Sequence, residues 1–342
     1  MLISADTLDD LLRRALEQIL LNGARVEEAS RGPNRELVCV LLQLTNPRAR
    51  LSHTETKGKV FSALGELAWY LSASDDAEFI MYYIREYKDE VEIDGTIHGA
   101  YGPRLFAAGW YNQFENVVKL LRGKPSSRKA VIQLFDAGDL AGTYKDIPCT
   151  CTLQFMIRAG RLDMIVSMRS NDAFWGLPHD VFSFTMLQEI MARMLEIELG
   201  EYSHFAGSLH VYDRHAAEVE RFLAEGVQGT VEAAMLPMPP ANPWPSIRVF
   251  RRAEAAIRTG LPLEEEVNTL DSYWQDLVRL LMVFRHSKNN EFKAISRIKD
   301  EMVDRVYREY IAMREQPRQV ALNQPSQPAA SPPANGDDAG GR

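Results

Sequence analysis

Two short segments bring together residue types that could do covalent chemistry: residues 146–155 and residues 168–180. The first segment holds a candidate nucleophile, Cys149, directly after a proline. The second holds the pair Arg169-Ser170, which could bind a phosphate through a guanidinium and a hydroxyl group. A cysteine attacks as its thiolate, and a nearby guanidinium lowers the pKa of a thiol because it stabilises the anion. The segments therefore hold residue types that could perform covalent catalysis on a phosphorylated substrate, with Cys149 as a candidate nucleophile and Arg169 as a candidate to stabilise its thiolate.

Residue type alone does not decide which of the three cysteines reacts. Most free cysteines are small buried hydrophobic residues, so a structural role is the alternative for each. Cys151 follows Cys149 by two positions and would face the same side of a strand. We interpret Cys151 and Cys39 as core residues. An odd number of cysteines without a regular framework also indicates a reducing compartment.

Length, composition and charge describe an ordinary globular protein. Of the 342 residues, 46% are hydrophobic and 25% are charged, and the net charge is −8. This charge argues against a general nucleic-acid binder. Residues 1–12 carry acids and are not a signal peptide, and no apolar run is long enough to span a bilayer. We therefore expect a cytoplasmic protein with no membrane or nucleic-acid partner.

Periodicity in the apolar residues predicts interleaved strands and helices, which is typical of an α/β or α+β chain. Glu66 is an acid on an otherwise apolar predicted helix, where a charge is costly unless it is paired or functional. The predicted strands are residues 36–44, 130–135, 151–157, 162–168 and 203–212. The predicted helices are residues 8–22, 60–71, 112–122, 181–195, 246–259, 263–285 and 291–313.

The composition changes towards the C-terminus and divides the chain. A catalytic domain, residues 1–235, is predicted to end at a Pro-rich linker, residues 236–246. A helical region, residues 247–316, follows and is expected to pack on the catalytic core. The last segment, residues 317–342, is rich in Pro, Ala, Asn and Gly and is predicted to be disordered.

In their order and spacing, the two chemical segments resemble the active-site core of the thymidylate synthase family. Cys149, in a Pro-Cys pair with Gln154 five residues on, fits the family's nucleophile motif, and Arg169-Ser170 fits its phosphate motif. The resemblance covers roughly residues 25–215. It implies a thymidylate synthase-like α/β fold, in which a twisted mixed sheet covered by helices dimerises back to back, with a helical C-terminal region added.

The resemblance also implies a reaction. Cys149 would add to carbon 6 of a pyrimidine, because carbon 5 is a poor nucleophile until that addition makes it enolate-like or enamine-like. Carbon 5 would then attack 5,10-methylenetetrahydrofolate, the one-carbon donor, and no metal would take part. Glu66 and Tyr101 are the other catalytic residues that the resemblance implies, with Glu66 organising water and proton transfers.

Binding roles follow from the same resemblance. The residues expected at the 5′-phosphate are Arg31, Arg128, Lys129, Arg169 and Ser170. Two of these, Arg128 and Lys129, would reach across from a second subunit, which implies a homodimer with shared active sites. The remaining binding residues are Gln154 and Asp180 for the base, His210 and Tyr212 for the sugar, and Asp172, Trp69 and Gly176 for the folate. A simple core position is the alternative for Trp69.

Asp180 distinguishes this chain within the family pattern. Thymidylate synthases have Asn at this position, whose amide reads N3–H and O4 of uracil, whereas cytosine presents N3 as an acceptor and N4 as a donor. A carboxyl group accepts from N4 and, when it is protonated, also satisfies N3. An unsatisfied buried polar group costs about 1–3 kcal/mol, roughly ten- to hundredfold, so Asp180 favours cytosine. The alternative for Asp180 is a helix N-cap.

The chain therefore looks most like the cytidylate (CMP or dCMP) 5-hydroxymethylase branch, and above all like the CMP hydroxymethylases of nucleoside-antibiotic biosynthesis. Thr150, His179 and Ser208 stand where the family commonly has His, Phe and Asp, and Tyr87 aligns loosely with a tryptophan of the methyl-forming branch. Thymidylate synthases end in a short tail that seals the folate pocket for hydride transfer, whereas this chain continues into helices. Water, activated by Glu66, would then complete the reaction and give the 5-hydroxymethyl nucleotide.

Two alternatives stay open. A true thymidylate synthase would methylate dUMP and release dihydrofolate. A catalytically silent nucleotide-binding protein would use its helical C-terminus to bind a partner, although the intact set of candidate site residues argues against it.

Overall fold

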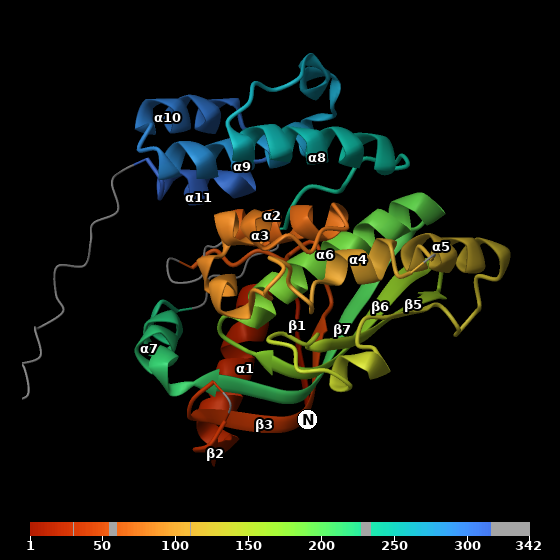
Figure 1. Ribbon diagram of the computed structural model, residues 1–342, viewed down its shortest axis with the longest axis vertical. Helices are drawn as coiled ribbons and strands as arrows, with labels where there is room; N and C mark the ends of the chain where they lie inside the picture. The colour runs from red at the N-terminus through yellow and green to blue at the C-terminus, as the bar shows by residue number, and fades with distance from the viewer. Residues whose placement is uncertain (30, 55–59, 110, 227–233, 316–342) are drawn as a thin grey trace, which may run out of the picture.

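The fold is built on one mixed β-sheet (Figure 1). The computed structural model describes residues 1–29, 31–54, 60–109, 111–226 and 234–315. Within these residues seven strands form the sheet, in the order β1-β3-β7-β6-β5-β4, with β2 paired to β3. The pairs β1–β3 and β6–β7 are parallel and the others are antiparallel. The strands are β1 (Leu2–Ala5), β2 (Ala24–Val26), β3 (Asn34–Leu44), β4 (Val131–Gln133), β5 (Thr150–Arg158), β6 (Arg161–Asp172) and β7 (Glu198–Tyr212).

Helices cover one face of this sheet in successive layers (Figure 1). α1 and α6 contact the strands, α2 packs on α6, and α8 and α9 pack on α2. The mixed α/β architecture predicted from the sequence is confirmed. The helices are α1 (Leu8–Asn22), α2 (Val60–Leu71), α3 (Ala77–Tyr83), α4 (Tyr101–Phe106), α5 (Gln113–Gly123), α6 (Gly176–Leu195), α7 (Ala216–Ala224), α8 (Trp244–Thr259), α9 (Ser272–Lys288), α10 (Phe292–Glu301) and α11 (Arg308–Ala312).

The first two long helices have the bounds that the sequence predicts. α1 starts where the hydroxyl of Thr7 accepts a hydrogen bond from the backbone N–H of Asp10, 3.2 Å away. Its apolar residues recur every third or fourth position and face the sheet. α2 is apolar around nearly its whole circumference because it is covered from both sides.

α6 is the central helix of the core and starts earlier than predicted. It begins at Gly176 rather than at residue 181, because Pro178 is compatible with a first helical turn. Sixteen of its residues are buried, and they include polar side chains. Gln188 ties α6 to the sheet, since its Nε2 donates to the carbonyl oxygens of Leu162 (2.8 Å) and Glu201 (3.1 Å).

The sheet is irregular along one line that crosses β5, β6, β7 and β3. The β5–β6 register shifts between Thr150 and Thr152, and Cys39 of β3 has a positive φ of 58°. Gly207 of β7 lies so close to β6 that a Cβ there would meet the carbonyl oxygen of Arg169 at 2.9 Å. Such irregularities bend strands and re-aim side chains. The line separates the regular part of the sheet from the strand ends that carry the candidate site.

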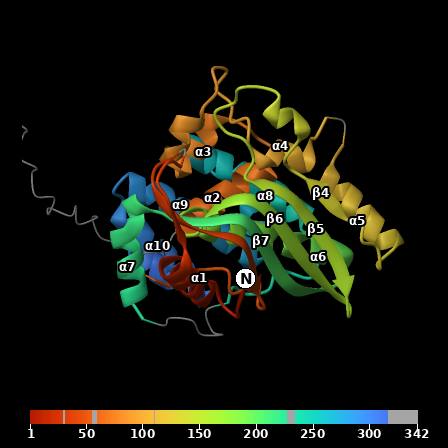
Figure 2. The same ribbon diagram turned by 90° about the horizontal axis from the view of Figure 1, so that it is seen from below.

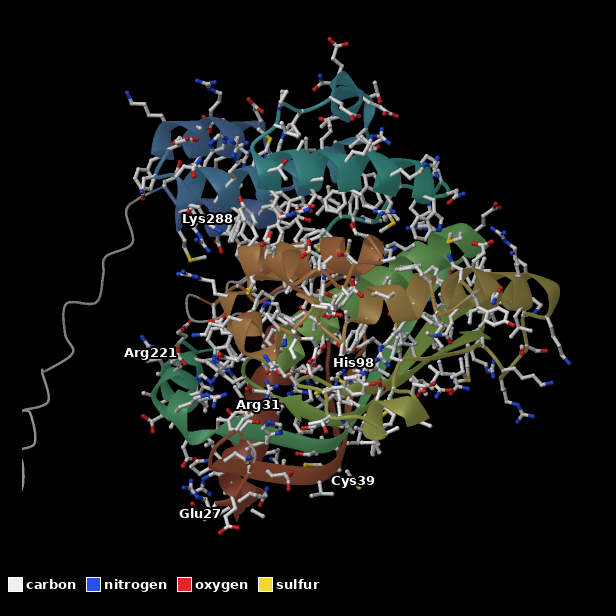
Figure 3. The ribbon with its side chains drawn as sticks, viewed as in Figure 1. Glu27, Arg31, Cys39, His98, Arg221 and Lys288 are labelled. Atoms are coloured by element: carbon white, nitrogen blue, oxygen red, sulfur yellow. The ribbon has the colours of Figure 1, made fainter. Side chains whose placement is uncertain are left out.

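The structure corrects the interpretation of Cys39 and Cys151 as core residues. Cys39 is exposed at its left-handed position and lies near the outer edge of the molecule (Figure 3). Cys151 is half-buried at the register shift of β5, whereas Cys149 precedes the strand. The prediction assumed a regular pleat with a period of two residues, and the register shift breaks that period.

The second face of the sheet is much less covered. Ile165, Phe205 and Leu41 are only partly buried there, and they alternate with fully buried neighbours on the helical side. Seen from below, β5, β6 and β7 have no helix drawn over them (Figure 2). This is the face that a back-to-back dimer would use, and the homodimer stays a prediction.

The C-terminal helices form a layer over α2 and α3. Tyr83 of α3 donates to the carboxylate of Glu254 in α8, 2.8 Å away. Lys288 of α9 donates to the carbonyl oxygen of Tyr82, 2.9 Å away, from its place between the two layers (Figure 3). α8 begins at Trp244, inside the predicted linker, because Pro245 is tolerated in a first turn.

Two predicted C-terminal helices are corrected in their bounds. The predicted helix 263–285 begins only at Ser272, where Asp271 accepts a hydrogen bond from the backbone of Tyr273 at 2.9 Å. The predicted helix 291–313 is interrupted after α10, because the carboxylate of Asp276 accepts hydrogen bonds from the backbone N–H groups that follow Met302.

The division of the chain into domains stays a prediction, and the predicted tail, residues 317–342, lies outside the described residues. No helix within the described ranges is long and apolar enough to cross a membrane.

Candidate active site

Cys149 lies directly before β5 and is held by the neighbouring strand. Its carbonyl oxygen accepts a hydrogen bond from the backbone N–H of Arg169, 2.9 Å away. The guanidinium of Arg169 donates from Nε to the carbonyl oxygen of Pro148 (3.0 Å) and from Nη2 to that of Ile147 (2.9 Å). Arg169 therefore fixes the backbone that presents the thiol, and its exposed guanidinium keeps further donors for an anion.

The thiol of Cys149 is protonated at neutral pH in the unliganded protein. Burial raises its pKa to about 11, and the charges of Asp146 and Asp180 act in the same direction. Arg169 and Arg31 lower the pKa, but burial outweighs them. The predicted effect of Arg169 on the thiol pKa is therefore present, but burial, which the motif does not record, has the larger effect.

Glu66 lies on α2 with only 6% of its surface exposed. Tyr87 donates a hydrogen bond to Glu66 Oε1 at 2.8 Å. Burial raises the pKa of Glu66 to about 7, and hydrogen bonds from Tyr87 and Tyr70 oppose the rise. A carboxyl group with this pKa can both give and take a proton near neutrality.

Asp180 faces the same cluster from α6. Asn171 of β6 donates from Nδ2 to Asp180 Oδ2 at 2.7 Å. Burial and the nearby charge of Glu66 raise the pKa of Asp180 well above its usual value, although the hydrogen bond from Asn171 opposes this. The N-cap alternative is wrong, because the cap of α6 is Trp175 and Asp180 lies inside the helix.

Gly176, predicted to contact folate, lies against the Asn171–Asp180 hydrogen bond. A Cβ at Gly176 would meet Asn171 Nδ2 at 3.2 Å and Asp180 Oδ2 at 3.6 Å. A larger residue would therefore press on the pair from the start of α6. The structure places Gly176 beside Asp180, and a folate contact stays a prediction.

Tyr101 joins the cluster from the start of α4. Its hydroxyl oxygen lies 3.2 Å from the backbone N–H of Thr150 and 3.0 Å from the hydroxyl of Thr150, and both donate to it. Burial raises the pKa of Tyr101 well above its usual value, and the charges of Asp180 and Cys149 add to the rise. The phenol is therefore neutral and fixed beside Thr150, the residue that follows Cys149.

The predicted sugar residues lie at the end of β7. The rings of His210 and Tyr212 meet edge to face with centroids 4.8 Å apart, and Arg214 stacks over Tyr212 at 4.3 Å. Burial lowers the pKa of His210, and Asp172 opposes the effect. Burial raises the pKa of Tyr212, and the charges of Asp172 and Cys149 add to the rise, so Tyr212 lies near Cys149.

Asp172 has a structural task besides its predicted folate contact. Its Oδ1 accepts from the backbone N–H groups of Phe174 (2.8 Å) and Trp175 (3.0 Å), which sets the start of α6. The other carboxylate oxygen has no hydrogen-bond partner among the described residues, so it can accept one from a ligand.

The predicted phosphate residues divide into two groups. Arg31 is exposed, pairs with Glu90 and lies near enough to Cys149 to influence its pKa (Figure 3). Ser170 is half-buried, on β6 next to Arg169. Arg128 and Lys129 are exposed before β4, and the structure does not bring them to Cys149 within one chain.

Two predicted ligand contacts are not in the cluster. Gln154 donates from Nε2 to the carbonyl oxygen of Arg128 at 3.0 Å, so its side chain faces the β4 edge rather than Asp180. Trp69 is 1% exposed and packs against Tyr87 with ring centroids 5.6 Å apart. This burial favours the core alternative for Trp69.

The structure adds residues to the site that the motifs missed. Asp146 is half-buried, and burial raises its pKa to about 6, with the charge of Glu90 adding to the rise. Its side chain packs so closely on Gly99 that a Cβ there would meet Asp146 Oδ2 at 2.2 Å. The signal that could have identified Asp146 is an acid three residues before Cys149. The motifs also missed Asn171 as the partner of Asp180 and Tyr87 as the partner of Glu66. Among the residues with described positions, no group of three or more His, Cys, Asp or Glu could hold a metal ion.

The fold and the site define a protein whose cysteine, acids and arginines gather at the bent end of a mixed sheet. The chain matches the family model described as "Thymidylate synthase" over residues 14–238, and it belongs to the thymidylate synthase family. Among solved structures it is similar to a thermostable thymidylate synthase A from Bacillus subtilis. The TM-score is 0.57 with 26% identity, covering 66% of this chain and 86% of that chain. The predicted thymidylate synthase-like fold is thereby confirmed.

Two phage proteins are among its curated relatives. The deoxyuridylate hydroxymethyltransferase of Pseudomonas phage M6 is 31% identical over 223 residues, which is 62% of this chain and 61% of that protein. The deoxyuridylate hydroxymethyltransferase of Bacillus phage SP01 is 29% identical over 201 residues, which is 54% of this chain and 52% of that protein. The chain thus spans between half and two thirds of the length of these relatives. Both names refer to a uridylate, so the predicted cytidylate branch is a proposal.

Proposed function

We propose that this chain transfers a one-carbon unit from 5,10-methylenetetrahydrofolate to carbon 5 of a pyrimidine nucleoside monophosphate, and that water completes a 5-hydroxymethyl product. The observation that carries the proposal is the largely buried cluster of Cys149, Glu66 and Asp180, in which the charge of Asp180 acts on Cys149 and the charge of Glu66 acts on Asp180. The names of the phage relatives agree with hydroxymethyl transfer. The folate supplies the electrophilic carbon, and the side chains supply the nucleophile and move the protons.

Cys149 starts the reaction as a neutral thiol. When its sulfur bonds to carbon 6 of the base, the thiol proton must pass to an acceptor. Asp146 suits this task because its charge acts on the thiol and its pKa is about 6. Arg169 and Arg31 would bind the phosphate and favour the thiolate as the proton leaves.

Glu66 would activate the water that ends the reaction. Its pKa of about 7 leaves a substantial fraction ionised at neutral pH, so it can take a proton from water. Tyr87 holds the carboxylate in place at 2.8 Å. Glu66 thus combines a fixed position with a suitable pKa.

Asp180 would read the base as a neutral acid. Oδ2 accepts from Asn171, so the proton belongs on Oδ1. Oδ1–H can donate to N3 of cytosine while Oδ2 accepts from its N4 amino group. A cytidylate is therefore our first candidate substrate, and CMP is tested before dCMP because of the resemblance to CMP hydroxymethylases.

A uridylate is the second candidate, and a specific observation favours it. Both phage relatives are named for deoxyuridylate. A neutral carboxyl group offers one donor and one acceptor, as an amide does, so Asp180 can also pair with O4 and N3–H of uracil. The orientation of the Asp180 carboxyl group, which sets where its donor and its acceptor point, decides which of the two bases it pairs with.

The test is mass spectrometry of the products after incubation with methylenetetrahydrofolate and equal amounts of CMP, dCMP, UMP and dUMP. We expect a hydroxymethyl group on a cytosine nucleotide, and Asp180→Asn should shift the preference towards uracil by roughly ten- to hundredfold. A hydroxymethyl group on uracil alone would replace the first candidate with the second. A methyl group on dUMP, with dihydrofolate, would identify a thymidylate synthase, and no product would favour a silent nucleotide-binding protein.

We also propose that the active protein is a cytoplasmic homodimer. The half-exposed sheet face and the exposed Arg128 and Lys129 at its β4 edge support this arrangement, because these two residues do not reach Cys149 within one chain. Sedimentation of the full chain tests the dimer. Mixing a Cys149→Ser subunit with an Arg128→Ala subunit should restore activity if sites are shared, since some mixed dimers would then keep one intact site.

A further inference from the structure

A hydrogen-bonded relay runs from β3 to the sugar residues at the end of β7. Ser208 donates from its hydroxyl to Glu36 Oε1 across the two strands. The same hydroxyl oxygen lies 3.3 Å from His210 Nδ1. Glu36 is directly opposite His210 in the β3–β7 register, so the three side chains share one patch of the sheet. None of the motifs in the sequence predicted a role for Glu36.

The direction of the hydrogen bonds follows from the chemistry of the groups. The hydrogen bond from Ser208 Oγ to Glu36 Oε1 uses the single hydroxyl hydrogen of Ser208. The lone pairs of the Ser208 oxygen then face His210 Nδ1, which must carry the hydrogen. Burial lowers the pKa of His210, although Asp172, Glu36 and the backbone of Ser208 oppose this, and a lowered pKa favours the neutral ring, which then carries hydrogen on Nδ1 alone. Its Nε2 is left as an acceptor.

We propose that Glu36 and Ser208 are positioning residues that hold His210 in the Nδ1–H tautomer, so that Nε2 accepts a hydrogen bond from a hydroxyl of the nucleotide sugar. The inference rests on the proposed function in one respect, that a nucleotide sugar occupies this end of β7. A hydroxyl group must donate to reach such an acceptor, so the relay selects a sugar that carries one there. Tyr212, edge to face with His210, fixes the plane of the ring.

A purely structural role for the contact would be to link two strands. The same strand pair already has such a link elsewhere, since Gln43 of β3 donates to Glu201 of β7 at 2.7 Å. That link involves no histidine. Gln43→Ala is therefore a matched control, because it removes a polar contact between the same strands without touching the relay.

The experiment measures nucleotide binding by calorimetry with the full chain and three variants: Ser208→Ala, Glu36→Ala and Glu36→Gln. Three probes are used: CMP, 2′-deoxy-CMP and 3′-deoxy-CMP. We expect Ser208→Ala and Glu36→Ala to weaken CMP binding about tenfold, because His210 then loses its tautomer preference. Glu36→Gln should keep most of the affinity, since its amide oxygen still accepts from Ser208. The probe that lacks the contacted hydroxyl should bind wild type and both alanine variants equally, which identifies the 2′ or the 3′ position.

Nitrogen chemical shifts of His210 provide a readout that does not need ligand. The relay requires hydrogen on Nδ1 in the wild type and in Gln43→Ala, and a changed tautomer ratio in Ser208→Ala. Hydrogen on Nε2 in the wild type would overturn the inference, and so would equal losses of affinity for all three probes. Product formation in the same samples separates the two proposals. The expected binding pattern without product would overturn the proposed reaction and support the relay.

Discussion

The hydroxyl of Tyr87 lies 2.8 Å from Glu66 Oε1, and it joins two elements that α3 separates in the sequence. Glu66 belongs to α2, while Tyr87 belongs to a 3-10 segment, Arg85–Glu90. The ring of Tyr87 also packs edge-on against Trp69 of α2, so its position is fixed by packing as well. The phenol of Tyr87 thus orients the buried acid and, together with that of Tyr70, limits the rise of its pKa.

Replacing Tyr87 with Phe should move the pH dependence of the reaction. The hydrogen bond from Tyr87 lowers the pKa of Glu66, so its loss raises that pKa above about 7. If Glu66 acts as a base, the acidic limb of the kcat profile should shift to higher pH by about one unit, which equals about 1.4 kcal/mol. Tyr82→Phe is the control, because Tyr82 lies outside this cluster. An unshifted profile in Tyr87→Phe would show that another group controls the rate.

Replacing Glu66 with Gln should make the free energy of unfolding less dependent on pH. The folded-state pKa of about 7 exceeds the usual 4.5, so the folded protein binds this proton more tightly than the unfolded chain. The free energy of unfolding therefore falls as pH rises from about 4.5 to about 7 and is level above that. Relative to wild type, Glu66→Gln should gain on the order of 2 kcal/mol between pH 5 and pH 8, measured by denaturant unfolding. A difference that stays constant with pH would contradict the raised pKa.

Replacing Cys149 with Ser should abolish turnover without loss of the fold. A serine hydroxyl is a far weaker nucleophile towards carbon 6, so product formation should fall by at least about a thousandfold. Cys151→Ser is the matched control, since it changes the neighbouring thiol at the register shift and should leave turnover within a few-fold of wild type. Equal losses in both variants would indicate a structural effect rather than a missing nucleophile. Product formation and thermal unfolding should be measured together.

Replacing Glu189 with Ala should destabilise the packing of α6 against Arg48, Arg50 and Met238. Although burial disfavours its charge, Arg50 and Arg48 hold the pKa of Glu189 below its usual value, and Met238 N–H donates to it at 3.1 Å. Arg50 is fully buried, so Glu189→Ala leaves an uncompensated charge and should cost about 3–5 kcal/mol of unfolding free energy. Arg252→Ala, in an exposed ion pair, should cost less than about 1 kcal/mol. Similar costs in the two variants would contradict this account.

The sequence predicted those elements whose signals are local. The bounds of α2 were correct because its apolar run is long and ends sharply. The bounds of the last helices were wrong because Asp276 stops one of them from a distant helix, and no local pattern records such a contact. The exposure of Cys39 was missed because a left-handed backbone at a cysteine has no composition signal.

The sequence predicted those site residues that lie in short motifs. Cys149 and Arg169 were found from two motifs, and the structure brings the segments together. The high pKa of the thiol was not predictable, because burial depends on every element around it. The pair of Glu36 and Ser208 was missed since its members lie on different strands and meet only through the sheet register.

One consequence follows from α2, in which all residues except Ser62 are buried. A helix of this kind has no face suited to water, and its outer side is dry only because α8 and α9 cover it. A shortened protein that stops before Trp244 would expose a continuous apolar surface along α2 and should aggregate. A shortened protein would therefore need polar residues on the outer side of this helix to stay in solution.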